Sequence, residues 1–181
     1  CSHAMNDDTD GGAEGFNQEV MDDDGGVSIM WRKQLNSKVM KVQADFGSVV
    51  GIIFDSGRSR ILLMSIYAPT VGKDLEFSDH LDNLTALFDR EDSKFDEIIT
   101  LGDWNMNEKS EISRLEEMDI WSTQRGLVRL DPPKPTHRHF VQKDWTFLDC
   151  AYVTDPSTIT VHNSDLSFIS TSDHQPITAY I

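Results

Sequence analysis

The sequence contains few cysteines, no long apolar run and far fewer basic than acidic residues. Its two cysteines among 181 residues are Cys1 and Cys150, and this spacing fits neither a metal clip nor a disulfide framework. A chain without disulfides is typical of a reducing compartment, so we expect an intracellular protein, cytoplasmic or nuclear. No apolar run approaches the roughly 18 residues of a membrane span, and the N-terminus shows no secretory pattern, so a membrane partner is not expected.

The shortage of basic residues is concentrated near the N-terminus. The net charge is −15, and residues 1–24 hold eight of the 31 acidic residues and no Lys or Arg. We expect this acidic leader to be disordered. Within it, residues 1–14 are assigned to a tag and leader, because Cys1–Ala4 before Met5 resembles a cloning remnant. Residues 15–181 are enough for one domain with a sizeable core.

The remaining chain is mildly acidic, which bears on the class of partner. Such a surface disfavours nucleic acid unless a bound cation offsets the acidic groups or a local basic rim exists. Candidate rim cations, whose alternative role is a solvated surface, are Arg32, Lys33, Arg58, Arg60, Lys134, Arg138 and Lys143.

Apolar periodicity predicts mostly strands with two helices. The predicted strands span residues 26–31, 39–46, 49–54, 60–67, 98–101, 127–130, 146–153, 158–162 and 177–181. The helices are predicted over residues 77–90 and 110–124, where apolar residues recur at helical spacing. Hairpins, then a helix, then strands alternating with loops favour two facing sheets with helices outside.

The stretch Ile98–Asn105 is the most informative part of the sequence. It predicts a buried strand that ends in a sharp polar turn at Gly102, with Asp103 and Asn105 on one side of the chain. The carboxylate can bind a metal or take a proton, and the amide can donate to a phosphate oxygen. The alternative is a plain turn in which both side chains cap the backbone.

Other polar residues also occur at predicted strand boundaries: Tyr67, Asp149 and the pair Asp173 and His174. An unpaired buried carboxylate costs several kcal/mol, on the order of the total stability margin, so Asp149 needs a donor, and His174 is a natural one. Such a pair would fix the imidazole tautomer. Plainer roles are an aromatic at a sheet edge for Tyr67, a structural buried pair for Asp149 and His174, and a loop cap for Asp173.

Six short motifs that include these residues occur in order: Gly25–Val27, Ile66–Thr70, Leu101–Asn105, Pro135–Arg138, Leu148–Asp149 and Ser172–Pro176. With them, roughly residues 15–181 resemble the endonuclease/exonuclease/phosphatase superfamily, and most closely the apurinic-type endonuclease domain of non-LTR retrotransposons. The resemblance implies an α+β fold, a four-layer α/β/β/α sandwich of two facing, mostly antiparallel sheets. It also implies a metal-dependent phosphodiester hydrolase using Mg²⁺ or Mn²⁺, an endonuclease that nicks DNA by in-line attack of water.

The resemblance assigns roles to the matched residues. Tyr67 and Asn105 would contact the scissile phosphate, and Asp103 would orient or deprotonate the attacking water. Asp149 would pair with a catalytic His174.

Further positions match the metal and substrate regions of the superfamily. Asp173 would lie at the divalent metal, and Thr136 and Arg138 fall where groups near the substrate often occur.

The resemblance is incomplete at the N-terminus. Superfamily members begin with a strand carrying an Asn and a second strand ending in Gln-Glu, whose Glu is the principal metal ligand. Here Gly15-Phe16 falls at the step after that Glu, so the domain is interpreted as N-terminally truncated. Glu19 is a candidate substitute ligand, but only five residues separate it from Gly25. Two alternatives therefore stay open: a catalytically impaired binding module, and a phosphatase of the same superfamily.

Overall fold

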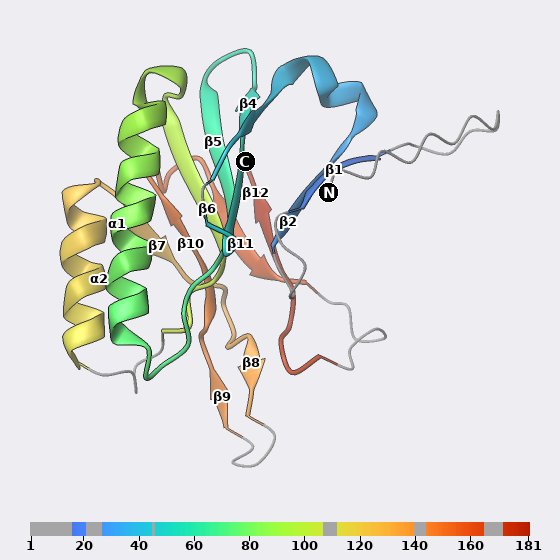
Figure 1. Ribbon diagram of the computed structural model, residues 1–181. Coiled ribbons are helices and arrows are strands. Elements are labelled where there is room, and N and C mark those ends of the chain that lie inside the picture. The colour runs from blue at the N-terminus through green and yellow to red at the C-terminus, as the bar shows by residue number, and fades with distance from the viewer. Residues whose placement is uncertain (1–15, 21–26, 45, 107–111, 140–143, 165–171) are drawn as a thin grey trace.

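The computed structural model describes residues 16–20, 27–44, 46–106, 112–139, 144–164 and 172–181 (Figure 1). The predicted tag and leader, residues 1–14, lies outside these ranges, as does the motif glycine pair Gly25 and Gly26.

A mixed six-stranded sheet forms the centre of the molecule (Figure 1). In spatial order it consists of β3 (Val39–Val42), β4 (Val49–Asp55), β5 (Arg60–Tyr67), β6 (Glu97–Asp103), β10 (Asp149–Val153) and β7 (Val128–Leu130). Strands β5 and β6 are parallel, and the other neighbours in this sheet are antiparallel. A parallel pair needs a long crossover connection, which here contains a helix.

Two α-helices cover one face of this sheet (Figure 1), α1 (Asp74–Glu91) and α2 (Ile112–Gln124). Alternate residues of β5, Leu62, Met64 and Ile66, point into the core that the helices close with residues such as Phe77 and Leu84. Two short 3-10 turns follow β2 and α1, η1 (Lys33–Lys38) and η2 (Asp92–Lys94). Within the described ranges, the helices lack the combination of length and apolar character that crossing a bilayer requires.

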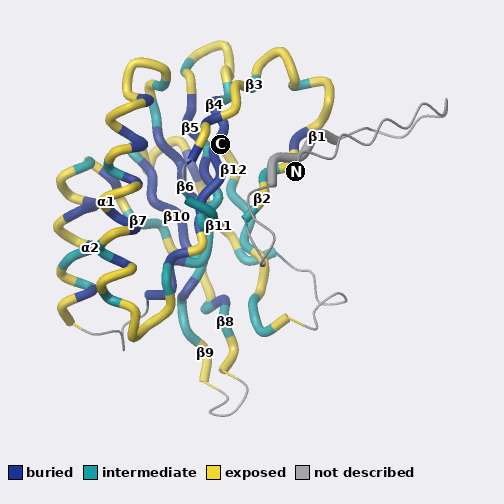
Figure 2. Tube along the Cα trace, viewed as in Figure 1, coloured by how far each residue is buried: buried dark blue, intermediate teal, exposed yellow. Residues whose placement is uncertain are grey.

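The opposite face of the sheet carries a second core. Ile61, Ile99 and Val153 from the central strands pack with Val161 and Ile177. The latter two belong to the antiparallel pair β11 (Thr160–Asn163) and β12 (Ile177–Tyr180). The central strands are therefore covered on both sides, as Figure 2 shows by their dark blue segments.

Two further strand pairs complete the fold: β1 (Phe16–Val20) with β2 (Ser28–Arg32), and β8 (His137–Arg138) with β9 (Trp145–Thr146). The predicted α+β class is confirmed, with a dominant central sheet and strands facing it. Helices α1 and α2 cover one face of the central sheet. In the described part of the chain no α-helix lies over β11 and β12, on the opposite face.

The predictions of individual elements were wrong at two places. The acidic leader, residues 1–24, was expected to be disordered, but residues 16–20 form β1 because they pair with β2 along all five positions. Glu19 pairs with Ile29 through this register, and its proposed role as a metal ligand stays a prediction, since its side chain lies outside the described structure. The predicted strand 146–153 is split into β9 and β10.

His80 is a buried imidazole on α1 that faces the sheet. It is 4% exposed, its Nδ1 lies 3.2 Å from the Ser48 hydroxyl, and its ring meets Phe46 edge-on at 5.6 Å. Burial, followed by the positive charge of Arg114, lowers the pKa of His80 from 6.5 to about 4.

We therefore predict that the free energy of unfolding falls as the pH drops from 6.5 to about 4. In this window the unfolded chain binds a proton at His80 that the folded chain does not, so the contribution, up to about 3 kcal/mol, is complete above the unfolded pKa and is lost below it. Urea unfolding at several pH values measures this.

The matched variants are His80→Gln, which removes the titrating group, and His162→Gln, which removes an exposed imidazole on β11. The His80→Gln protein should have a flatter pH dependence than the parent, and His162→Gln should behave like the parent. Equal slopes for the parent and His80→Gln would rule out a contribution from this buried imidazole.

Candidate active site

The strand register places three polar residues in one row. Tyr67 at the end of β5 lies opposite Asp103 at the end of β6, and Asp103 lies opposite Asp149 at the start of β10. Neighbouring strands are about 4.8 Å apart, so the row spans about 10 Å. By alternation it shares the sheet face of Leu101 and Ala151, which contribute to the core under β11 and β12. The row therefore lies at one end of the face opposite the helices.

Gly102 brings β6 close to β5 just before this row. Its φ is 155°, and a Cβ atom added there would lie 1.9 Å from the carbonyl oxygen of Ile66. Only glycine fits this approach of the two backbones. The residue therefore fixes where β6 ends and where Asp103 emerges.

The turn after Asp103 is held by its own side chains. The backbone N–H of Asn105 donates to Asp103 Oδ1 over 2.8 Å, and the Asn105 amide donates to the Ala68 carbonyl over 2.7 Å. Asn105 has a φ of 50° and is 9% exposed. The capping alternative is thus realised, and contact with a phosphate would use the remaining amide hydrogen of Asn105.

His174 comes from a distant part of the chain and meets both aspartates. Its Nδ1 lies 2.9 Å from Asp149 Oδ2, and its Nε2 lies 3.9 Å from Asp103 Oδ2. The Asp149 hydrogen bond raises the pKa of His174, and burial raises the pKa of the Asp103 carboxyl. The structure therefore brings together the two aspartates and the histidine that the sequence singled out.

Backbone hydrogen bonds hold the segment around His174 against β8. The N–H of Arg138 donates to the Asp173 carbonyl over 2.8 Å, and the N–H of Gln175 donates to the Thr136 carbonyl over 2.6 Å. An isolated antiparallel bridge pairs His137 with His174. The motif 172–176 is therefore placed by the motif 135–138.

Thr136 and Arg138 lie beside the row but differ in exposure. Thr136 is fully buried, and its hydroxyl accepts a hydrogen bond from the backbone N–H of Asp149 over 3.2 Å. It therefore positions Asp149 in this structure and does not face solvent. Arg138 is exposed on β8, next to Asp173.

Asp173, the predicted metal ligand, lies in a small cluster with His137 and His174. His137 Nε2 is 3.6 Å from Asp173 Oδ2, and the two imidazole rings are 4.7 Å apart. One donor atom from each of the three residues lies within 4.8 Å of the others. Carboxylate and imidazole donors suit a divalent cation, so the residues present fit such an ion.

Arg114 of α2 supports the site from the helix side. The side chain is 1% exposed, and its guanidinium lies 3.9 Å above the ring of Phe77. It donates to the carbonyls of Pro69 and Thr70, the latter over 3.2 Å. These two residues directly follow Tyr67 and Ala68, so Arg114 holds the chain segment that leaves the row.

Sequence reasoning missed His137 and Arg114. His137 lies inside the motif Pro135–Arg138. It could have been found because histidine is a common metal ligand and His137 lies between the predicted site residues Thr136 and Arg138. Arg114 precedes Met118 and Trp121 by four and seven residues, and this spacing places a charge on the buried face of a helix.

Two predicted rim cations lie far from the row. Arg60 begins β5 and Arg58 lies in the turn before it, whereas Tyr67 ends β5, roughly 23 Å from Arg60 at about 3.3 Å per residue. Arg60 instead pairs with Asp96 at 3.1 Å. The prediction that these arginines border the site is wrong, and Lys143 lies outside the described residues.

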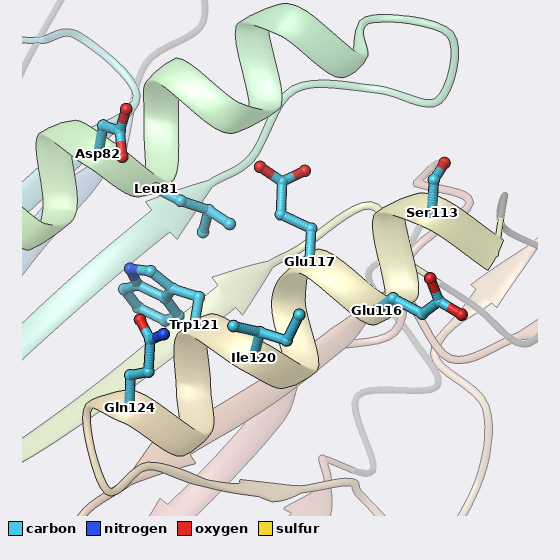
Figure 3. A pocket seen from close by; sticks show the side chains of 8 residues that line it. All are labelled: Leu81, Asp82, Ser113, Glu116, Glu117, Ile120, Trp121 and Gln124. Atoms are coloured by element: carbon cyan, nitrogen blue, oxygen red, sulfur yellow. The ribbon is translucent and has the colours of Figure 1, made fainter.

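A hollow of about 400 Å³ opens elsewhere, between α1 and α2 (Figure 3). Leu81, Ile120 and Trp121 form its apolar part, and Asp82, Glu116 and Glu117 are the charged residues that line it. Three carboxylates without a Lys or Arg repel a phosphate. The hollow between α1 and α2 is therefore not a candidate site for binding a phosphate group.

One comparison with known proteins, the match to a family model, gives the family of this chain. The family model Exo_endo_phos_2, described as endonuclease-reverse transcriptase, matches residues 61–178. A search of curated protein sequences found no match to this chain.

Several solved structures are similar in fold at low sequence identity. The endonuclease domain of TRAS1, a telomere-specific non-LTR retrotransposon, has a TM-score of 0.68 and 16% identity, with 91% of this chain and 76% of that chain covered. The 3′ phosphatase NExo from Neisseria, bound to a product DNA hairpin, has a TM-score of 0.58 and 16% identity, with 75% and 65% covered. The inositol polyphosphate 5-phosphatase domain of SPsynaptojanin, with inositol bisphosphate and calcium, has a TM-score of 0.55 and 12% identity, with 92% and 62% covered. At these identities the likeness concerns the fold.

We predict that Gly102→Ala destabilises the protein by at least about 3 kcal/mol, because the new methyl group meets the Ile66 backbone. Gly57→Ala is the matched control, since Gly57 also has a positive φ, 83°, but nothing within 4 Å of an added Cβ. It should cost only about 1–2 kcal/mol. Urea unfolding measures both, and equal losses would show that the close approach at Gly102 is not a constraint.

Proposed function

This chain belongs to the Exo_endo_phos_2 family, the endonuclease–reverse transcriptase family, and we propose that it is a divalent-metal-dependent endonuclease that hydrolyses a phosphodiester bond of DNA. The wider superfamily comprises metal-dependent phosphoesterases, which act on different phosphate esters. The observation that carries the proposal is the convergence of Tyr67, Asp103, Asp149 and His174 at one end of a sheet face.

In this proposal Asp103 acts on the attacking water. It is held by the Asn105 backbone through Oδ1, which leaves Oδ2 directed at the space shared with His174. Burial raises the pKa of the Asp103 carboxyl and makes it a better proton acceptor than an exposed aspartate. In the proposed reaction Asp103 orients the water and takes its proton.

In this proposal His174 stabilises charge on the phosphate. Its Nδ1 is occupied by Asp149, which fixes the ring so that Nε2 faces Asp103 across 3.9 Å. The hydrogen bond to Asp149 also favours the protonated imidazole, as its raised pKa indicates. A phosphate oxygen between these groups would accept a proton or a hydrogen bond from Nε2.

Tyr67 lies at the open end of the row and is 47% exposed, so its hydroxyl is accessible to a substrate. Asn105 retains one amide hydrogen for a phosphate oxygen. A divalent cation near Asp173 would neutralise charge on the leaving oxygen. DNA is favoured as the substrate because the superfamily likeness is strongest, among the structures compared above, to a retrotransposon endonuclease.

We predict that the protein nicks supercoiled plasmid in the presence of Mg²⁺ or Mn²⁺, and that Asp103→Ala and His174→Ala each lower the rate by about 10²–10⁴-fold. Gel electrophoresis of plasmid forms over time measures the rate. Asp119→Ala on α2 and His162→Ala on β11 are the matched controls, since both residues are exposed and neither belongs to the row.

Each other outcome has a definite meaning. Nicking that survives both site variants would identify a contaminating nuclease and contradict the assignment of these residues. Absence of nicking by the parent protein would favour the impaired binding module. Release of inorganic phosphate from small phosphoesters without nicking would favour the phosphatase.

A further inference from the structure

The residues around Asp173 differ from an all-oxygen magnesium site, because two imidazoles accompany the carboxylate. We propose that His137 is a metal ligand, so that the ion at this site is bound through nitrogen as well as oxygen and is a transition-metal ion such as Mn²⁺ or Co²⁺ in preference to Mg²⁺. This inference rests on the proposed function for the role of the ion, though not for its binding.

The backbone fixes the position of His137 independently of any ion. The residue lies on β8, where it pairs with Thr146 on β9 and forms a bridge with His174 on its other side. The neighbouring hydrogen bond from Arg138 to the Asp173 carbonyl ties the same strand to the loop that carries Asp173. His137 and Asp173 are thus held next to each other by main-chain contacts.

Both imidazoles are oriented as metal ligands usually are. His137 Nδ1 lies 3.2 Å from the Thr146 hydroxyl, and His174 Nδ1 lies 2.9 Å from Asp149 Oδ2. When Nδ1 donates to such a partner, the tautomer leaves a lone pair on Nε2, and this arrangement is typical of histidines bound to metals. In both residues the Nε2 atom is the one near Asp173 or Asp103.

The donor atoms of His137, Asp173 and His174 need to move only slightly to bind one ion. The three donor atoms lie within 4.8 Å of one another, and His137 Nε2 is already 3.6 Å from Asp173 Oδ2. Ligands bound at about 2.1 Å from one ion are about 3–4 Å apart, so movements of roughly 1 Å suffice. All three residues are partly exposed, which leaves a path for the ion and for water.

The donor set determines the class of ion. Mg²⁺ prefers oxygen ligands and retains most of its waters, whereas the affinity of a site with nitrogen ligands rises along the first-row divalent ions from Mn²⁺ to Co²⁺. His174 completes the set in the DNA-free protein. His137 and Asp173 are the ligands that remain when a phosphate engages His174.

The test is the binding of Mn²⁺ to the full chain in the absence of DNA, followed by electron paramagnetic resonance with electron-spin-echo detection of coupled nitrogen. The parent protein should bind one Mn²⁺ and show imidazole nitrogen coupling. His137→Ala should weaken Mn²⁺ binding at least about tenfold and reduce the nitrogen signal. His162→Ala, which removes an exposed histidine on β11, should change neither.

Parent protein that binds Mn²⁺ without nitrogen coupling would overturn the proposal, and so would a folded His137→Ala protein with unchanged affinity. Circular dichroism shows whether each variant is folded, and His137→Gln serves if the alanine variant is not. Because DNA is absent, the result is separable from the nicking assay. Nitrogen-coupled Mn²⁺ without nicking would contradict only the endonuclease proposal, and nicking without nitrogen coupling would contradict only this one.

Discussion

The register between β5, β6 and β10 is the constraint on which the site depends. Tyr67, Asp103 and Asp149 form a row only because β5 and β6 end, and β10 begins, at the same level of the sheet. A shift of one residue in any of them would turn that side chain toward the helices. The close contact of Gly102 with the Ile66 carbonyl prevents such a shift between β5 and β6, since any larger residue beside it would collide with the backbone.

The second half of the site is added to this row by short-range hydrogen bonds between distant segments. The Thr136 hydroxyl accepts a hydrogen bond from the backbone N–H of Asp149, and the Thr136 carbonyl accepts one from the backbone N–H of Gln175 in the 172–176 motif. His174 then reaches Asp149 and faces Asp103. The buried Thr136 therefore fixes the loop that carries His174 relative to the central sheet.

Much of this architecture could be predicted from the sequence, because each signal was local. The apolar run of β5 was predicted at its observed bounds, and the turn at Gly102 followed from a glycine before Asp and Asn. The pairing of β1 with β2 could not be predicted, since its strand residues lie in an acidic leader and gain their order from a partner. His137 and Arg114 were missed for a related reason, because their neighbours come from other elements. The arginines at the start of β5 were misplaced because charge alone does not indicate which end of a strand a substrate meets.

The separation of the two sheet faces affects which substitutions the protein can accept during evolution. The hydrophobic core under α1 and α2 lies on one side of the strands, and the polar row lies on the other. Substitutions in the layer formed by α1 and α2 can therefore change the thermal stability of the protein without altering the polar row. Arg114 is an exception, because it extends from α2 to the carbonyls just beyond Tyr67. A substitution at Arg114 would change the chain segment that follows Tyr67, so this helix residue shares the selective pressure on the row.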